Sequence, residues 1–396
     1  PAPLSWSVPG VLADLFQPIV PTTNAGYLVG KTWKVFEKLS TLYIKGDLNH
    51  ALTDDVTLRG NIGLQLVHTD QSSSSTFFNE ATNSPSPISD GKTFNDVLPA
   101  ANFVFQLPAQ QAVRLGVAKE VARARMDQLA ASYDFSISNS TGIPSANVGN
   151  PRLDPWRADA VDISYEKYFA NKGYVSVAGF YKNLKTYIYN LTVDGYDFSQ
   201  YTSQVPQATF PVPIQPDGFL TLPLNGKGGR LDGVELTVSA PGDLLTDYLS
   251  GFGATASVSQ TDSSVRIQGA IAGGNSTDIT LPGLSKTVWS AMLYYEKYGF
   301  SARIATRYRS NYIGEITDYS GSRALEYVRH EQITDFQTGY EFQRGPVKGL
   351  SILFQINNLT NAPFIDYVQT PQRVRDYETF GRDFFFGFNY KFSSDR

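Results

Sequence analysis

Apolar and polar residues alternate with a period of two along most of this chain. The alternation is clearest close to the C-terminus, where aromatic side chains occupy every second position: Phe384, Phe386, Phe388, Tyr390 and Phe392. In a second strong run, residues 58–66, apolar residues or glycine at even positions alternate with Arg59, Asn61, Gly63 and Gln65. Since successive side chains of a strand point to opposite faces, this pattern predicts β-strands with one apolar face.

The alternating runs are long, and the gaps between them alternate in length. We predict about thirteen strands, at residues 40–50, 56–69, 94–106, 111–123, 157–169, 173–189, 229–240, 251–266, 285–296, 299–315, 323–342, 348–365 and 374–392. Strands of globular proteins average about 5–6 residues, whereas a tilted membrane strand needs roughly 9–11. Short and long gaps alternate most regularly in the first two thirds of the chain, as in a barrel with short turns at one end and long loops at the other. The pattern predicts an all-β fold, a transmembrane antiparallel up-and-down β-barrel; a two-sheet sandwich is the alternative. Helical patterning is weak, and the best helix candidate is residues 121–132.

Composition removes several other classes of protein. The 396-residue chain has no cysteine, and its three histidines, His50, His68 and His330, lie far apart in sequence. This excludes a disulfide scaffold and a cysteine nucleophile, and it disfavours a histidine metal cluster. The net charge of −4 disfavours a nucleic-acid partner. The sequence has no G-x-S-x-G elbow and no glycine-rich loop between a strand and a helix, so we expect no enzyme activity, no cofactor and no metal.

Four segments carry more specific motifs. They are residues 149–169 (GNPRLDPWRADAVDISYEKYF), 230–240 (RLDGVELTVSA), 350–364 (LSILFQINNLTNAPF) and the aromatic last strand. In composition, order and spacing they resemble the corresponding segments of TonB-dependent outer-membrane transporters. Residues 95–126 also fit the large subfamily common in Caulobacter- and Xanthomonas-like bacteria. The resemblance implies a location in the outer membrane of a Gram-negative bacterium.

The chain departs from the family pattern in what it contains. The family has a globular plug inside a barrel of 22 strands, whereas about thirteen strands and no plug are visible here. We therefore expect residues 35–396 to be the C-terminal part of such a barrel and residues 1–34 to be an extracellular segment. The residues 393–396 also follow the terminal aromatic, where the family usually ends. The partners that the resemblance implies are the plug and remaining strands, from the same protein or another chain, a TonB-type energy-coupling protein acting through the plug, and outer-membrane lipid.

The parity of the gaps places candidate ligand residues near the extracellular end. Trp156 and Arg157 follow one long loop, and a structural turn is the alternative interpretation. Tyr196 and Tyr201 lie in another, where aromatic faces would stack on sugar rings or pack within the loop. The later strands carry residues that would hold an anion or form salt bridges within the wall: Asp318, Tyr319, Arg323, Arg375 and Asp376.

Three arginines share one face of a predicted strand: Arg303, Arg307 and Arg309. They predict a positive stripe facing the lumen, or, since buried charges need partners, ion pairs with acidic residues such as Glu341.

These observations favour an active uptake transporter for a large polar solute. The aromatic, uncharged loops favour an oligosaccharide, and a ferric siderophore is the alternative that suits an Arg- and Tyr-lined lumen. A passive porin and a surface binding protein are the remaining alternatives.

Overall fold

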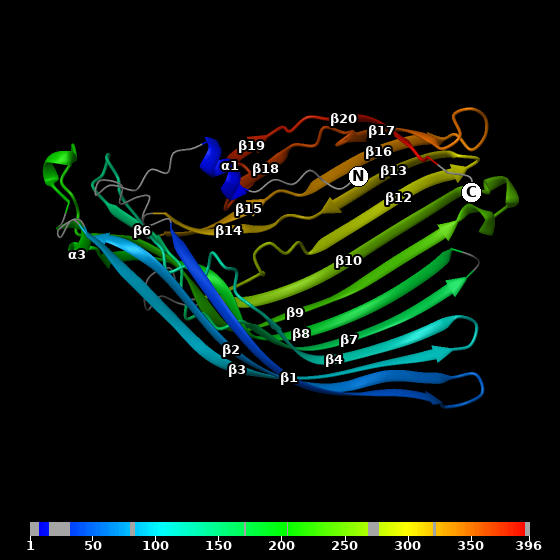
Figure 1. Ribbon diagram of the computed structural model, residues 1–396, viewed down its shortest axis with the longest axis horizontal. Coiled ribbons are helices and arrows are strands. Elements are labelled where there is room, and N and C mark those ends of the chain that lie inside the picture. Colours follow the sequence, from blue (N-terminus) through cyan, green and yellow to red (C-terminus); the bar gives the residue numbers. More distant parts are fainter. Residues whose placement is uncertain are drawn as a thin grey trace.

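Thirteen antiparallel strands follow one another across a single curved sheet, which we call the main sheet (Figure 1). The computed structural model describes residues 8–15, 32–79, 84–169, 172–203, 205–267, 277–319 and 322–392. Within them the strands are, in sheet order, β1 (Trp33–Ala51), β2 (Thr57–Asn79), β3 (Ser84–Leu107), β4 (Gln111–Ala122), β7 (Trp156–Phe169), β8 (Gly173–Asp197), β9 (Asp217–Pro241), β10 (Phe252–Ile267), β12 (Thr287–Lys297), β13 (Phe300–Arg309), β16 (Glu331–Glu341), β17 (Leu350–Asn357) and β20 (Asp383–Tyr390). The predicted all-β, up-and-down arrangement of about thirteen strands is confirmed.

The shorter strands gather at one end of the main sheet, as β6 (Pro144–Val148), β14 (Tyr312–Tyr319) and β15 (Ser322–Val328) show (Figure 1). β5 (Tyr133–Ile137) and β6 pair with each other, β6 also joins β9 in parallel, and β11 (Thr277–Ile279) pairs with β10. A separate small sheet contains β14, β15, β18 (Phe364–Val368) and β19 (Val374–Glu378). The helical elements are α1 (Val8–Leu15), α3 (Ser199–Thr202), η1 (Gln207–Thr209), η2 (Gly242–Leu244) and η3 (Asp247–Leu249). None of the helices in the described residues is long and apolar enough to cross a membrane.

Strand register aligns the alternating residues into one apolar face. A single row of directly paired residues runs across seven strands: Ala240, Ala254, Leu293, Ile304, Phe336, Ile356 and Phe384. Many apolar-face side chains are exposed, Phe386 to 72% of its surface. A contiguous apolar surface of this extent marks contact with lipid or with another protein.

The opposite face of the main sheet, the polar face, carries hydrogen-bonding and charged side chains. Asn102 donates to Asn61 at 3.2 Å, and Ser257 and Ser290 pair at 2.8 Å. Arg114 forms a two-pronged ion pair with Glu166, with Nε 2.8 Å from Oε1. The main sheet therefore has the two unlike faces that a membrane-barrel wall requires.

The last four predicted strands are wrong as continuous strands, because each of these segments forms two separate strands in the structure. Residues 299–315 form β13 and the start of β14, and residues 323–342 form β15 and β16. Between β17 and β18, Asn358 and Asn361 have φ of 50° and 54°, and the Asn358 side chain accepts a hydrogen bond from the Ala362 amide at 2.8 Å. This asparagine turn cannot continue a strand, because its φ values are left-handed. The outer half of each segment therefore leaves the main sheet for the small sheet.

Other boundaries also differ from the predictions. The predicted helix over residues 121–132 is wrong: its start belongs to β4, and the rest is turn and extended chain. β2 and β3 continue far beyond their predicted ends because the polar run Gln71–Ser75 pairs with β3, although it lacks an apolar alternation. Of the predicted segment 1–34, the structure describes α1, Thr32 and the first residues of β1. The remainder of that segment, and the tail 393–396, lie outside the described residues.

Candidate ligand-binding surface at the long-loop end

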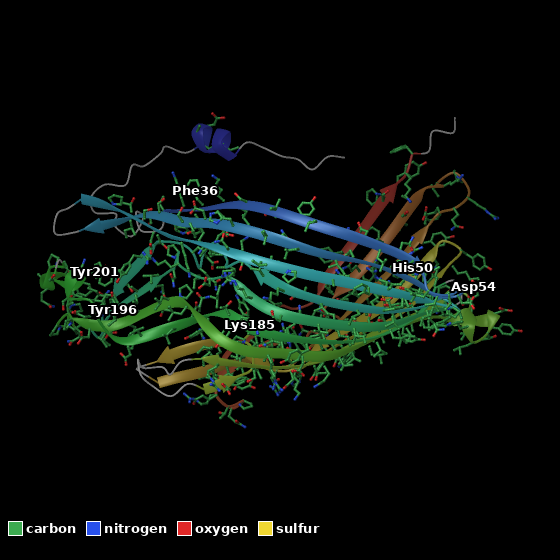
Figure 2. The ribbon with its side chains drawn as sticks, turned by 90° about the horizontal axis from the view of Figure 1, so that it is seen from below. Phe36, His50, Asp54, Lys185, Tyr196 and Tyr201 are labelled. Atoms are coloured by element: carbon green, nitrogen blue, oxygen red, sulfur yellow. The ribbon has the colours of Figure 1, made fainter. Side chains whose placement is uncertain are left out.

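The two ends of the main sheet are built differently. At the short-turn end, Thr53 Oγ1 accepts a hydrogen bond from the Val56 amide at 3.1 Å, which closes the turn that contains Asp54. Tyr196 and Tyr201 lie at the other end, the long-loop end, far from His50 and Asp54 (Figure 2). The long-loop end holds the longest connections, and loops of this kind often carry binding residues, so the predicted ligand residues are located there first.

One long connection, residues 123–155, lies across the outer parts of β2, β3 and β9, and we call it the strap. Gln71, which is 3% exposed, donates from Nε2 to the carbonyl oxygens of Pro151 and Leu153, both at 2.8 Å. The Ala131 amide donates to Ser73 Oγ at 2.8 Å. Because buried polar groups are costly to leave unpaired, these bonds fix the strap to the strands.

Ion pairs join the strap to β3, and β3 to β7. Arg152 contacts Asp90 at 2.9 Å, Lys92 contacts Asp154 at 2.8 Å, and Arg157 contacts Asp96 at 2.6 Å. Burial would raise the pKa of Asp154, but Lys92 and Arg157 together hold it below its usual range. Three cations face three carboxylates, so this network carries no formal excess charge.

Trp156 and Arg157, which are predicted ligand residues, both make structural contacts, in line with the alternative of a structural turn. Arg157 contacts both Asp96 and, at 3.4 Å, Asp154, and its guanidinium lies 5.5 Å above the Phe94 ring. Trp156 packs 6.1 Å from the Tyr187 ring in a buried cluster.

A cavity of about 520 Å³ nevertheless lies beside them, lined by Trp156, Arg157, Gln65, Glu120 and Lys182. Lys182 and Glu120 form an ion pair there at 2.7 Å. Gln65, Glu120 and Lys182 are not among the residues predicted from sequence. Their positions opposite the apolar alternation were the available signal.

The predicted stacking residues Tyr196 and Tyr201 belong to an aromatic cap, which is made of Tyr133, Phe135, Tyr196, Phe198 and Tyr201. Tyr201 stacks on Tyr133 at 5.0 Å, and Tyr196 meets Phe198 edge-on at 4.9 Å. Phe198 is fully buried. Burial raises the pKa of Tyr133 and of Tyr201, as expected for phenols packed against other rings. Most of these aromatic faces contact one another, which favours the loop-packing interpretation.

The predicted anion-binding residues of the later strands lie in the small sheet. Asp318 and Tyr319 end β14, and Arg323 lies in β15 directly opposite Asp318. Arg375 and Asp376 lie in β19, where Arg375 bonds Glu326 and lies 3.6 Å from Asp376. Burial raises the pKa of Glu326 despite Arg375, and the nearby Asp366 adds to this effect. Arg375 thus forms the salt bridges that were the alternative to ligand binding.

Arg303, Arg307 and Arg309 share the polar face of β13, opposite Ile304. Arg303 bonds the neutral amide oxygen of Gln337, and Arg307 contacts Asp335 at 2.8 Å. Arg309 donates to Ser285 Oγ at 3.0 Å and lies 3.7 Å over the Tyr312 ring. The suggested partner Glu341 instead contacts Lys391 at 3.8 Å.

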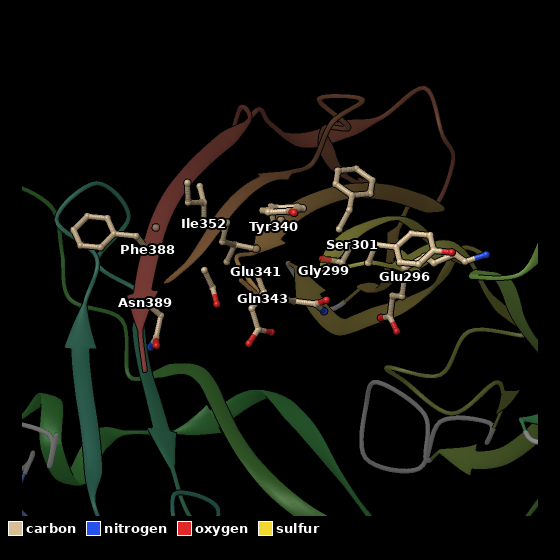
Figure 3. A pocket seen from close by; sticks show the side chains of 16 residues that line it. Glu296, Gly299, Ser301, Tyr340, Glu341, Gln343, Ile352, Phe388 and Asn389 are labelled. Carbon is tan, nitrogen blue, oxygen red and sulfur yellow. The ribbon is translucent and has the colours of Figure 1, made fainter. Parts of the chain in front are cut away.

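The polar face continues to the short-turn end, where a cavity of about 730 Å³ lies between β12 and β20. Glu296 and Glu341 point away from Tyr340 and Ile352, which are on the apolar face (Figure 3). Within the described residues, no group of three or more His, Asp or Glu side chains could hold a metal ion.

The predicted site residues thus fall into separate groups: the strap network, the aromatic cap, the small sheet and the β13 arginines. In the part of the chain that the structure describes, neither of the two cavities above contains residues from two of these groups.

Comparison with known proteins gives a family and several related folds. The model of the TonB-dependent receptor-like β-barrel family matches residues 12–359. No curated protein sequence matches significantly. The fold is similar to the ferric-catecholate import receptor Fiu from E. coli K12 (TM-score 0.56, 15% identity, 90% of this chain and 45% of that one). It is also similar to the siderophore receptor PiuA from Acinetobacter baumannii (0.55, 14%, 91% and 44%) and to the unliganded ferric citrate transporter FecA (0.52, 11%, 90% and 44%). The chain spans less than half the length of these three proteins.

Proposed function

This chain belongs to the family of TonB-dependent receptor β-barrels, and on that premise we propose that it forms part of the wall of an outer-membrane receptor that imports a ferric siderophore. The apolar face contacts lipid, and the polar face lines the lumen. Fiu is a ferric-catecholate import receptor, PiuA a siderophore receptor and FecA a ferric citrate transporter, which supports a ferric chelate as the cargo. At their low sequence identity, these three proteins share only the fold with this chain.

The observation that carries the cargo class is the pair of exposed guanidiniums of Arg303 and Arg307 on the polar face. Arg307 has a carboxylate partner, whereas the hydrogen bond of Arg303 goes to a neutral amide. Arg303 therefore keeps its charge available to an anionic ferric chelate, since guanidinium groups bind such oxygen ligands in a planar, two-pronged way.

The receptor needs more than these strands. Among the described residues β1 pairs only with β2, and β20 only with β17. Open strand edges are not stable in hydrocarbon, because their N–H and C=O groups have no partners there. Further strands close the barrel, a plug fills it, and a TonB-type protein supplies energy through the plug; this assignment rests on the family.

An oligosaccharide is less well supported as the cargo than a siderophore. Its basis was a set of free aromatic faces in the loops, and Tyr201, Tyr133 and Phe198 pack on one another instead. A passive porin remains a distinct outcome, because it would need neither plug nor energy.

The test is uptake of radiolabelled iron under iron limitation. The cells carry a deletion of the chromosomal receptor gene and express the receptor from a plasmid. The iron is supplied as catecholate or citrate chelates. We expect energy-dependent uptake. For Arg303→Gln the chelate concentration that gives half-maximal uptake should rise about 10- to 100-fold, because a charge-assisted hydrogen bond contributes roughly 1.5–3 kcal/mol. Arg266→Gln is the matched control, because it removes another exposed arginine, on the opposite side of the wall. Arg266 pairs with Asp278 at 2.9 Å near the long-loop end, on the side of the apolar face. Growth on a glycan in place of iron uptake would favour the oligosaccharide, and uptake insensitive to an uncoupler would indicate a porin.

A further inference from the structure

The turn between β9 and β10 differs from the other short turns described, because it folds into two 3-10 turns, η2 and η3. The Leu245 amide bonds the Gly242 carbonyl at 3.0 Å, and the Leu249 amide bonds the Thr246 carbonyl at 3.0 Å. A Cβ on Gly242 would lie 2.6 Å from the Leu249 carbonyl oxygen, so only glycine allows this close return of the chain. The turn at this short-turn end is therefore held in one conformation by its own hydrogen bonds and by close packing at Gly242.

This turn exposes large apolar side chains. Leu245 is 83% exposed and Tyr248 is 95% exposed. An apolar side chain is more stable out of water, so the exposure of Leu245 and Tyr248 indicates that an apolar environment surrounds this turn.

The turn and the apolar face enclose a groove of about 560 Å³. Its floor is formed by small residues of neighbouring strands: Ala240, Ala254 and Ala302. Leu244, Leu245 and Leu249 of the turn form one wall, and Leu293, Ile304 and Phe336 form the other. This volume lies within the roughly 300–1,000 Å³ of small-ligand sites.

From this geometry we propose that the groove holds one acyl chain of a phospholipid in the leaflet at the short-turn end. The groove is continuous with the apolar face through the row that joins Ala240, Ala254 and Leu293. A lipid chain is the occupant that this continuity favours, because the rest of that face is immersed in the same hydrocarbon.

Lys297 lies beside the groove, outside its lining, where it would meet the lipid head group. Lys297 follows Tyr295 on the apolar-face side of β12, and its ammonium lies 5.2 Å above the Tyr298 ring. Lys297 also adjoins the turn, since its Cβ lies 3.0 Å from the position that a Cβ on Gly251 would take. A lysine at this height keeps its charged end in the interface, where it meets the lipid phosphate.

The test is a titration of the full receptor, purified in detergent, with phosphatidylethanolamine, followed by native mass spectrometry. Ala254→Leu fills the floor of the groove and should weaken the tightest lipid-binding step about tenfold. The matched control is Ala256→Leu, since Ala256 lies on the same strand and face, outside the groove lining. Lys297→Gln should weaken the same step and remove its salt dependence.

Unheated gel mobility checks that each variant is folded. If Ala254→Leu does not fold, Leu245→Ser tests the groove through the wall that the exposed turn forms. Equal lipid affinity for Ala254→Leu and wild type, equal weakening by Ala256→Leu, or a receptor dimer that only Ala254→Leu abolishes would each overturn the proposal.

Discussion

Gln71 joins the strap to β2 of the main sheet. Its side-chain amide makes two buried hydrogen bonds at 2.8 Å, to the Pro151 and Leu153 carbonyl oxygens. Gln71→Ala removes both donors and leaves two carbonyl groups that must find water. A net hydrogen bond contributes about 1 kcal/mol, and an unsatisfied buried carbonyl costs about 1–3 kcal/mol. Allowing for water entry, we expect the free energy of strap opening to fall by about 2 kcal/mol, which raises the open population about 30-fold.

These 396 residues contain no cysteine, so a thiol introduced in the strap is the only one in this part of the receptor. Ala131→Cys places a small reporter in the strap at a position that is 9% exposed, and it keeps the backbone bond to Ser73. The rate of maleimide labelling on the receptor then follows the open population, provided that opening and closing are faster than labelling.

Gln65→Ala is the matched control for this experiment, because Gln65 lies on the same strand and the same face but is exposed. We expect it to change labelling less than threefold. If Gln71→Ala labels at the wild-type rate, or if both variants accelerate labelling equally, the strap is not held by these two bonds and the reasoning fails.

Two further predictions concern packing at the long-loop end. Gly226→Ala should lower the unfolding temperature, measured by gel mobility, because the new Cβ would lie 2.1 Å from the Tyr187 ring. Such overpacking lowers the free energy of unfolding by about 1–3 kcal/mol. Gly46→Ala is the control and should change the unfolding temperature far less, since no atom lies within 4 Å of its Cβ position. Burial raises the pKa of Tyr133 beside Tyr201, so the folded state favours the protonated phenol: stability is intact below the unfolded pKa of about 10 and falls as pH rises above it. Thermal unfolding against pH should show this loss, and it should be shallower in Tyr133→Phe; a loss beginning near neutral pH would contradict it.

Alternation was sufficient to predict the wall of the barrel but not the ends of its strands. Phe384 and Phe386 could be placed on the apolar face from sequence, because the period of two is a property of the strand itself. The extension of β2 through Ser72–Ser75 could not, because those serines pair with β3 without any apolar signal. The end of β17 could not be predicted from Asn358 either, because only the structure shows the left-handed φ of that residue.

The candidate ligand residues show the same division. Residue type indicated that Arg157, Tyr201 and Arg375 are able to bind a ligand. Only the tertiary structure showed that Arg157 faces Asp96, Tyr201 faces Tyr133, and Arg375 faces Glu326. These contacts join segments tens of residues apart in sequence, and no local pattern encodes them.

By itself, then, the sequence determined the two-faced antiparallel wall and its family motifs, since both depend on residue type at fixed local spacing. The tertiary structure decided which side chains remain available. Strand pairing and loop packing joined Arg157, Arg307 and Arg375 to carboxylates. They left Arg303 beside a neutral amide and folded the β9–β10 turn back over Ala254. The physical reason is that charge pairing and burial depend on what approaches from elsewhere in the chain, whereas alternation depends only on the next residue but one.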